Sequence, residues 1–178
     1  MIIRLGVMLP CAVIAACAIQ PPPDTASVPF GAFGTLDNDV AAANQASWAF
    51  AAPARTLNNP VDAARAAAAI DYLAGELSSN PRWIMMSPLT RQEMLRARAD
   101  VRQVLGIAPD APSQFVVETL LQFAWLWQSG NWPAAMQTLA SQIFTLPPQQ
   151  TLQVLNNLPY VQSANIASTD AAAQMLPD

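Results

Sequence analysis

Apolar residues recur every three or four positions through most of the chain, which is the period of an α-helix. The pattern is clearest in residues 60–77 and 88–105, where each segment has one continuous apolar face. The two faces consist of Val61, Ala64, Ile70, Leu73, Ala74 and Leu77, and of Met94, Ala97, Val101, Val104 and Leu105. Runs of strand-favouring residues are absent, and alanine, the best helix former, makes up about a fifth of the chain. The pattern therefore predicts an all-α protein.

Proline, glycine and small polar residues mark the ends of the predicted helices. Asn59 and Ser87 each stand as a capping residue before a first-turn proline, and Gly106 and Gly130 are suited to end helices. The predicted helices cover residues 37–52, 60–77, 88–106, 113–130, 132–144 and 147–158, with a shorter helix after Pro159. We expect a compact bundle of about five to seven short helices in residues 37–168. Residues 169–178 are expected to form a frayed tail.

The N-terminus has a different pattern, in which Arg4 precedes an unbroken apolar stretch from Leu5 to Ala16. This order, followed by small residues, is the layout of a secretory leader. A membrane-spanning helix needs about 20 residues, and the stretch is shorter and contains Pro10. Residues 1–16 are therefore predicted to be a signal peptide.

The end of this leader, Ile14-Ala15-Ala16-Cys17, resembles the lipobox of bacterial lipoproteins. The resemblance implies that Cys17 is lipidated, becomes the new N-terminus and attaches the protein to the membrane of the bacterial cell envelope. In lipoproteins with the usual sorting signals, a residue other than aspartate after the cysteine, here Ala18, implies the outer membrane facing the periplasm.

Two other interpretations of the leader stay open. Ala16-Cys17-Ala18 is also an A-x-A-like cleavage site, which would release a soluble periplasmic protein that begins at Ile19. Alternatively, the segment stays attached as an N-terminal helix.

Residues 17–36 are predicted to be a proline-rich tether. Pro21, Pro22 and Pro23 favour an extended polyproline geometry, and no apolar period follows them. We interpret the segment as a semi-rigid spacer that holds the domain off a membrane surface, or as a segment without a particular role. Phe30 and Phe33 lie within it and could dock onto the domain.

Composition excludes several classes of chemistry. The chain has no histidine and no lysine, so histidine-based and lysine-based catalysis is ruled out, and with it imidazole metal ligation. The net charge of −4 argues against nucleic-acid binding. Asp37-Asn38-Asp39 begins like a calcium loop but lacks its glycine and closing glutamate, so Asp37 and Asp39 are interpreted as helix caps. We expect no catalytic residue, cofactor or metal.

Two surfaces are candidates for partner binding. Residues 115–127 are apolar nearly all round, which is typical of a central buried helix, but Trp127 with Trp132 could stay open as a groove for a partner or lipid. Arg91, Arg98 and Arg102 fall on one stripe of their predicted helix. The stripe is either a solvated face with salt links or a docking face for anionic headgroups or an acidic partner. Arg98 and Arg102 repel each other unless a negative group lies between them.

The sequence thus predicts a non-enzymatic envelope lipoprotein, a helper or scaffold that binds another envelope protein. One alternative is a binding module for a small apolar ligand or lipid. Another is a carboxylate-dependent hydrolase, for which two facing acids in a cleft would suffice.

Overall fold

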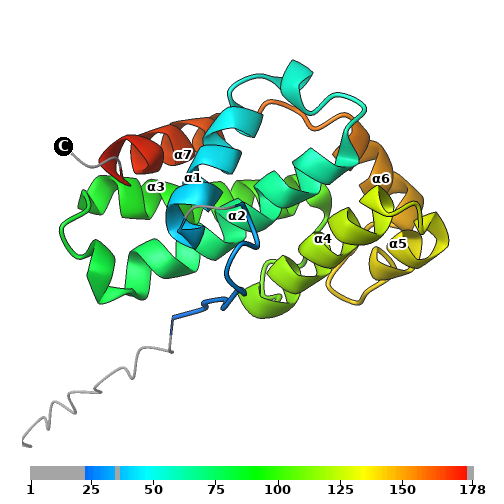
Figure 1. Ribbon diagram of the computed structural model, residues 1–178, viewed down its shortest axis with the longest axis horizontal. Helices are drawn as coiled ribbons and strands as arrows, with labels where there is room; N and C mark the ends of the chain where they lie inside the picture. The colour runs from blue at the N-terminus through cyan, green and yellow to red at the C-terminus, as the bar shows by residue number, and fades with distance from the viewer. Residues whose placement is uncertain (1–22, 35–36, 176–178) are drawn as a thin grey trace, which may run out of the picture.

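The computed structural model describes residues 23–34 and 37–175, which fold into a helical bundle (Figure 1). The helices are α1 (Asn38–Phe50), α2 (Pro60–Ser79), α3 (Pro88–Leu105), α4 (Ser113–Gln128), α5 (Trp132–Thr138), α6 (Pro148–Asn156) and α7 (Gln162–Met175), with short 3-10 turns η1 (Pro53–Arg55) and η2 (Pro81–Trp83). The prediction of an all-α bundle is confirmed. Cys17 and the predicted signal peptide lie outside the described residues. Within the described part of the chain, no helix combines the length and the apolar character that a membrane crossing requires.

The central helix of the bundle is α2, which packs against α1, α3, α4 and α6. Its middle turns are almost entirely alanine, and Ala66 to Ala69 are fully buried. Small side chains let neighbouring helices approach closely, so an alanine helix can be surrounded on several sides. The remaining contacts place α7 against α1 and α3, and α5 against α4.

The prediction that the fourth helix is the central buried element is therefore wrong. Only one face of α4 enters the core, through residues such as Leu120 and Phe123. On the opposite face, Phe115 is 59% exposed and Trp125 is 65% exposed. Helix α4 thus has more large apolar side chains than it buries in the core.

Most of the predicted helix ends are confirmed by their caps. Asn59 accepts a hydrogen bond from the backbone N–H of Asp62, and Pro60 opens α2. Gly106 ends α3 in the left-handed conformation, with φ of 66°. The predicted fifth helix is too long, since α5 ends at Thr138. The chain then turns back so that the N–H of Thr145 donates to the carbonyl of Gly106 over 2.6 Å.

The prediction of a frayed tail from residue 169 is wrong as far as Met175. Helix α7 continues to that residue, and Ala164, Ala167 and Ala171 are fully buried against its neighbours. The side-chain amide of Gln174 donates to the Thr90 hydroxyl over 2.9 Å, which fastens the end of α7 to the start of α3. The last helix therefore belongs to the core.

Candidate functional site

Residues 23–34 form an irregular segment, here called the strap, that lies across α2 and α4 and ends in two turns at residues 29–34. Ala26 is buried, and the backbone of Ser27 exchanges two hydrogen bonds with the side chain of Gln114, at 2.7 and 3.0 Å. The ring of Phe33 packs 5.5 Å from that of Tyr72, whereas Phe30 is exposed. The spacer predicted for residues 17–36 is therefore wrong for the strap, which is part of the folded domain.

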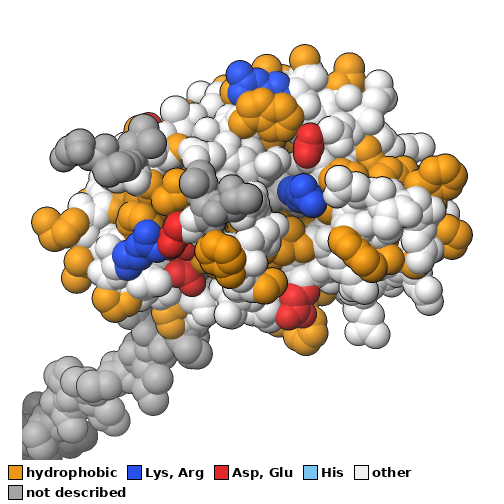
Figure 2. Space-filling view, in the orientation of Figure 1, with side chains coloured by type: hydrophobic (Ala, Val, Ile, Leu, Met, Phe, Trp, Pro, Cys, Tyr) orange, Lys and Arg blue, Asp and Glu red, His pale blue; other side chains and the backbone are white. Residues whose placement is uncertain are grey.

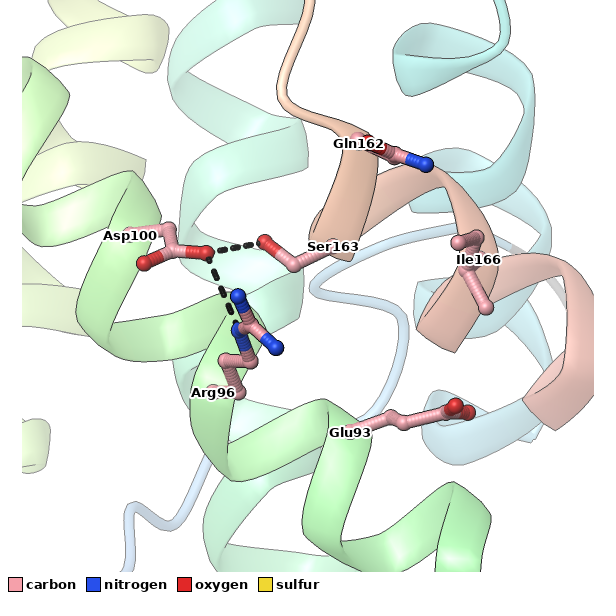
Figure 3. A pocket seen from close by; sticks show the side chains of 6 residues that line it. All are labelled: Glu93, Arg96, Asp100, Gln162, Ser163 and Ile166. Carbon is pink, nitrogen blue, oxygen red and sulfur yellow. Dashed lines mark hydrogen bonds and ion pairs between the residues drawn. The ribbon is translucent and has the colours of Figure 1, made fainter.

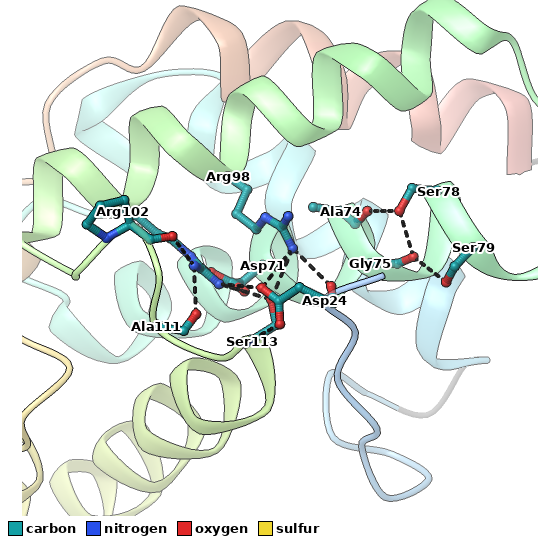
Figure 4. Close-up of polar contacts among 11 residues, drawn as sticks. Asp24, Asp71, Ala74, Gly75, Ser78, Ser79, Arg98, Arg102, Ala111 and Ser113 are labelled. Atoms are coloured by element: carbon teal, nitrogen blue, oxygen red, sulfur yellow. Dashed lines mark hydrogen bonds and ion pairs between the residues drawn. The ribbon is translucent and has the colours of Figure 1, made fainter. Parts of the chain in front are cut away.

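Asp24 fastens the strap to the bundle (Figure 4). Its carboxylate accepts hydrogen bonds from the backbone N–H and the hydroxyl of Ser113, both at 2.8 Å. The guanidinium groups of Arg98 and Arg102 lie 3.4 Å from the same carboxylate. Burial opposes ionisation of Asp24, but the Ser113 hydrogen bonds and the two arginines outweigh it, so the pKa of this carboxyl lies below its usual range.

Arg102 lies in the interior of the domain. Its Nε and Nη2 donate to the two carboxylate oxygens of Asp71 at 2.7 and 2.8 Å, and both residues are buried. Nη1 donates to the carbonyls of Pro109 and Ala111, and Nη2 also donates to the hydroxyl of Ser113. All five N–H donors of the guanidinium thus have partners within the chain. Burial alone would lower the pKa of Arg102, but the pairing with Asp71 raises it above its ordinary value.

The arginine stripe is consequently not one exposed face. Arg102 is buried, and Arg98 is mostly covered and donates to the carbonyl of Asp24 at 3.0 Å. Arg91 is half-buried near the start of α3 and makes no ion pair with another described residue. The expectation of a solvated or docking face is wrong for Arg102. Asp24 is the negative group that the spacing of Arg98 and Arg102 required.

The Asp24 contacts make the docking of the strap dependent on pH. Because the folded pKa of Asp24 is lowered, its contribution to stability is complete above the unfolded pKa of about 3.9 and disappears as the pH falls through the folded value. We expect thermal melts to show wild type as more stable than Asp24→Asn at neutral pH, with a difference that shrinks below about pH 4. A difference that stays constant down to strongly acidic pH would contradict this role.

A second polar cluster fixes the turn after α2. Asp39 is buried and accepts hydrogen bonds from the hydroxyl of Tyr72 at 2.6 Å and from Nε1 of Trp83 at 2.9 Å. Arg82 pairs with Asp39 at 3.2 Å and with Asp37 at 2.8 Å. Burial, followed by the Asp39 hydrogen bond, raises the pKa of Tyr72 well above its ordinary value, so the phenol stays protonated. Asp37 caps α1 as predicted, whereas Asp39 mainly positions η2.

The structure brings the two predicted tryptophans together at the junction of α4 and α5. The ring of Trp127 lies 5.5 Å from that of Phe123 and 6.4 Å from that of Trp132. Trp127 is half-buried, while Trp132 and Trp125 are exposed. We call Trp127 and Trp132 the tryptophan surface. Trp125 lies two residues from Trp127 on α4, about 200° around the helix axis, and so points to a different side of the helix. Its use as a partner site stays a prediction.

A cavity of about 350 Å³ lies between α3 and α7 (Figure 3). It contains two carboxylates, Glu93 and Asp100, which are two turns apart on the same helix with Arg96 between them. Asp100 is engaged, since it accepts a hydrogen bond from the Ser163 hydroxyl at 2.5 Å and lies 3.9 Å from Arg96. The two acids therefore do not face each other across the cavity as a hydrolytic pair would.

A second cavity of about 550 Å³ adjoins the C-terminal end of α3, beside Arg98 and Arg102. No aromatic residue is among the described residues that line either cavity. Across residues 23–34 and 37–175, no group of three or more acidic or cysteine side chains is placed to hold a metal ion.

Sequence reasoning missed Asp24, Asp71 and Ser113, which surround the two arginines. The one available signal was the repulsion between Arg98 and Arg102, which indicated that an acidic residue lies near both of them. That signal did not indicate which acidic residue it is. Comparison of the chain with protein-family models, with curated proteins and with solved structures found no match. A function therefore has to be argued from the residues and contacts of this chain.

Proposed function

We propose that the chain is a lipid-anchored protein of the bacterial cell envelope that binds another envelope protein and has no catalytic activity. The anchor is a lipid on Cys17, which follows Ile14-Ala15-Ala16 at the end of an apolar leader. With Ala18 as the next residue, the proposed location is the outer membrane, facing the periplasm. A soluble periplasmic form that begins at Ile19 is the alternative.

The observation that supports partner binding best is the tryptophan surface. Trp132 is 60% exposed and its ring lies 6.4 Å from that of the half-buried Trp127, although the domain has ample apolar residues in its core. Exposed, clustered tryptophans are typical of binding surfaces, where they contribute a large share of the binding energy. We assign the surface to a protein partner, since it lies on helix faces and no aromatic residue is among the described residues that line the two cavities above.

The position of this surface relative to the strap fits such a role. The strap contacts the first turn of α4 through Gln114, and Trp127 lies in the last turn of the same helix. At 1.5 Å per residue these positions are about 20 Å apart along the axis. A domain held at the membrane by its strap would therefore carry the tryptophan surface about 20 Å from the point where the strap docks.

The test is recovery of the partner from native membranes with wild type and with the variant Trp132→Ser. We expect Trp132→Ser to lose the partner, because truncation of a central interface tryptophan costs about 2 kcal/mol or more of binding free energy. Its melting temperature should stay close to that of wild type, since the Trp132 side chain is exposed.

Tyr160→Ser is the matched control, because Tyr160 is an exposed aromatic residue outside the tryptophan surface. It should recover the partner as wild type does. If Trp132→Ser still recovers every protein that wild type recovers, the tryptophan surface is not the binding site.

A further inference from the structure

The turn between α2 and α3, together with the first turn of α3, exposes three large apolar side chains within six residues. Ile84 is 68% exposed, Met85 is 91% exposed and Leu89 is 62% exposed. Residues 83–90 contain no charged side chain. Figure 2 shows hydrophobic side chains over this end of the molecule. We call Trp83, Ile84, Met85 and Leu89 the apolar turn.

The backbone of the apolar turn is held in place from within the domain. Trp83 donates to Asp39 at 2.9 Å, and the guanidinium of Arg82 lies 4.6 Å from the centre of the Trp83 ring. Met86 is buried and ties the far side of the turn to the core. Ile84 and Met85 are thus presented outward by an ordered turn, so that little conformational entropy is lost when they are covered.

The start of the strap lies over the second half of α2, and the apolar turn follows the end of that helix (Figure 1). Asp24 and Thr25 pass directly over Gly75, in the last turns of α2, where a Cβ atom would lie 2.8 Å from the Cα of Thr25. Five residues separate Cys17 from Pro23. Six Cα–Cα steps span at most about 20 Å. A lipid on Cys17 would therefore keep Pro23, at the start of the strap, within about 20 Å of a bilayer.

We propose that the apolar turn inserts into the surface of the bilayer to which Cys17 is anchored. This inference rests on the proposed lipid anchor. The occupant is a lipid surface because the anchor keeps the start of the strap close to the membrane, the strap crosses the helix that leads into the turn, and residues 83–90 are uncharged. Trp83 within the turn and Arg82 immediately before it are residue types suited to the headgroup level. The pairing of Arg82 with Asp37 limits the net charge that approaches the lipid. The apolar side chains would enter the boundary between headgroups and acyl chains to a depth of about 5–10 Å.

The test places an environment-sensitive fluorophore on Met85→Cys in the lipidated full-length chain, with Gln150→Cys as the control. Gln150 is exposed on α6, at the other end of the molecule. The labelled proteins are reconstituted into vesicles of phosphatidylethanolamine and phosphatidylglycerol that contain spin-labelled lipid. We expect a blue shift and several-fold stronger quenching at position 85 than at position 150.

Flotation of the same vesicles separates this inference from the proposed anchor. If the protein floats with the vesicles but position 85 is quenched no more than position 150, the anchor stands and the insertion of the turn is wrong. If position 85 is shielded in native membranes but not in lipid vesicles, a protein covers the turn and the lipid proposal is overturned. If the protein does not float at all, the anchor fails and the inference fails with it.

Discussion

Replacement of Arg102 by alanine is expected to lower the free energy of unfolding by about 3–5 kcal/mol, because it leaves Asp71 as a buried carboxylate without its partner. The loss is a large fraction of a typical margin of about 5–15 kcal/mol. The carbonyls of Pro109 and Ala111 lose their donor as well. Chemical denaturation monitored by circular dichroism would measure the change.

Arg96→Ala is the matched control for this prediction. Arg96 lies on the same helix, but its side chain is 79% exposed and its ion pair with Asp100 is 3.9 Å long. Such a surface pair contributes about 0–1 kcal/mol. Equal losses for the two variants would contradict the structural role assigned to Arg102.

A double variant identifies the origin of the loss. Asp71→Leu combined with Arg102→Met removes both charges and keeps side chains of useful volume in the interior. Replacement of a buried ion pair by apolar residues is often close to neutral, so the double variant should be more stable than Arg102→Ala. If the double variant is less stable than Arg102→Ala, the unpaired buried charge of Asp71 is not the main origin of the loss in Arg102→Ala.

Replacement of Cys17 by alanine is expected to abolish fatty-acid labelling and to remove the protein from the membrane fraction. Each buried methylene of an acyl chain contributes about 0.8 kcal/mol to membrane binding, so loss of the lipid removes most of the attachment. The apolar turn alone would give weak and reversible binding. Labelling with a fatty acid followed by fractionation measures both effects.

Cys11→Ala is the control for this variant, since Cys11 lies within the predicted signal peptide. It should be labelled and retained as wild type is. A Cys17→Ala protein that stays in the membrane fraction with its label would show that Cys17 is not the lipidated residue.

The helices could be predicted because the residues at and next to each helix end determine where the helix begins and ends. Pro60, Pro88 and Gly106 act on the residues next to them, and the apolar face of α3 follows directly from its period. The position of a helix in the bundle depends on all its neighbours. Hydropathy therefore favoured the tryptophan-rich α4 as the centre, whereas the close packing of alanine places α2 there.

The strap and the tail could not be predicted for related reasons. Residues 23–34 have no period of their own, and their conformation is set by contacts with residues far along the chain, such as Gln114 and Ser113. Helix α7 buries mainly alanines and a serine, with the large apolar Met175 only at its end, so its inner face gives a weak signal. The spacing of Arg98 and Arg102 defined a face of α3 but not what covers it.

The central claim, a lipid anchor on Cys17, is tested most directly by the mass of the N-terminal peptide of the mature protein isolated from its own membranes. The account predicts a chain that begins at Cys17 and has the added mass of a lipid on that residue. A chain that begins at an unmodified Ile19, or one that retains Met1, would contradict it.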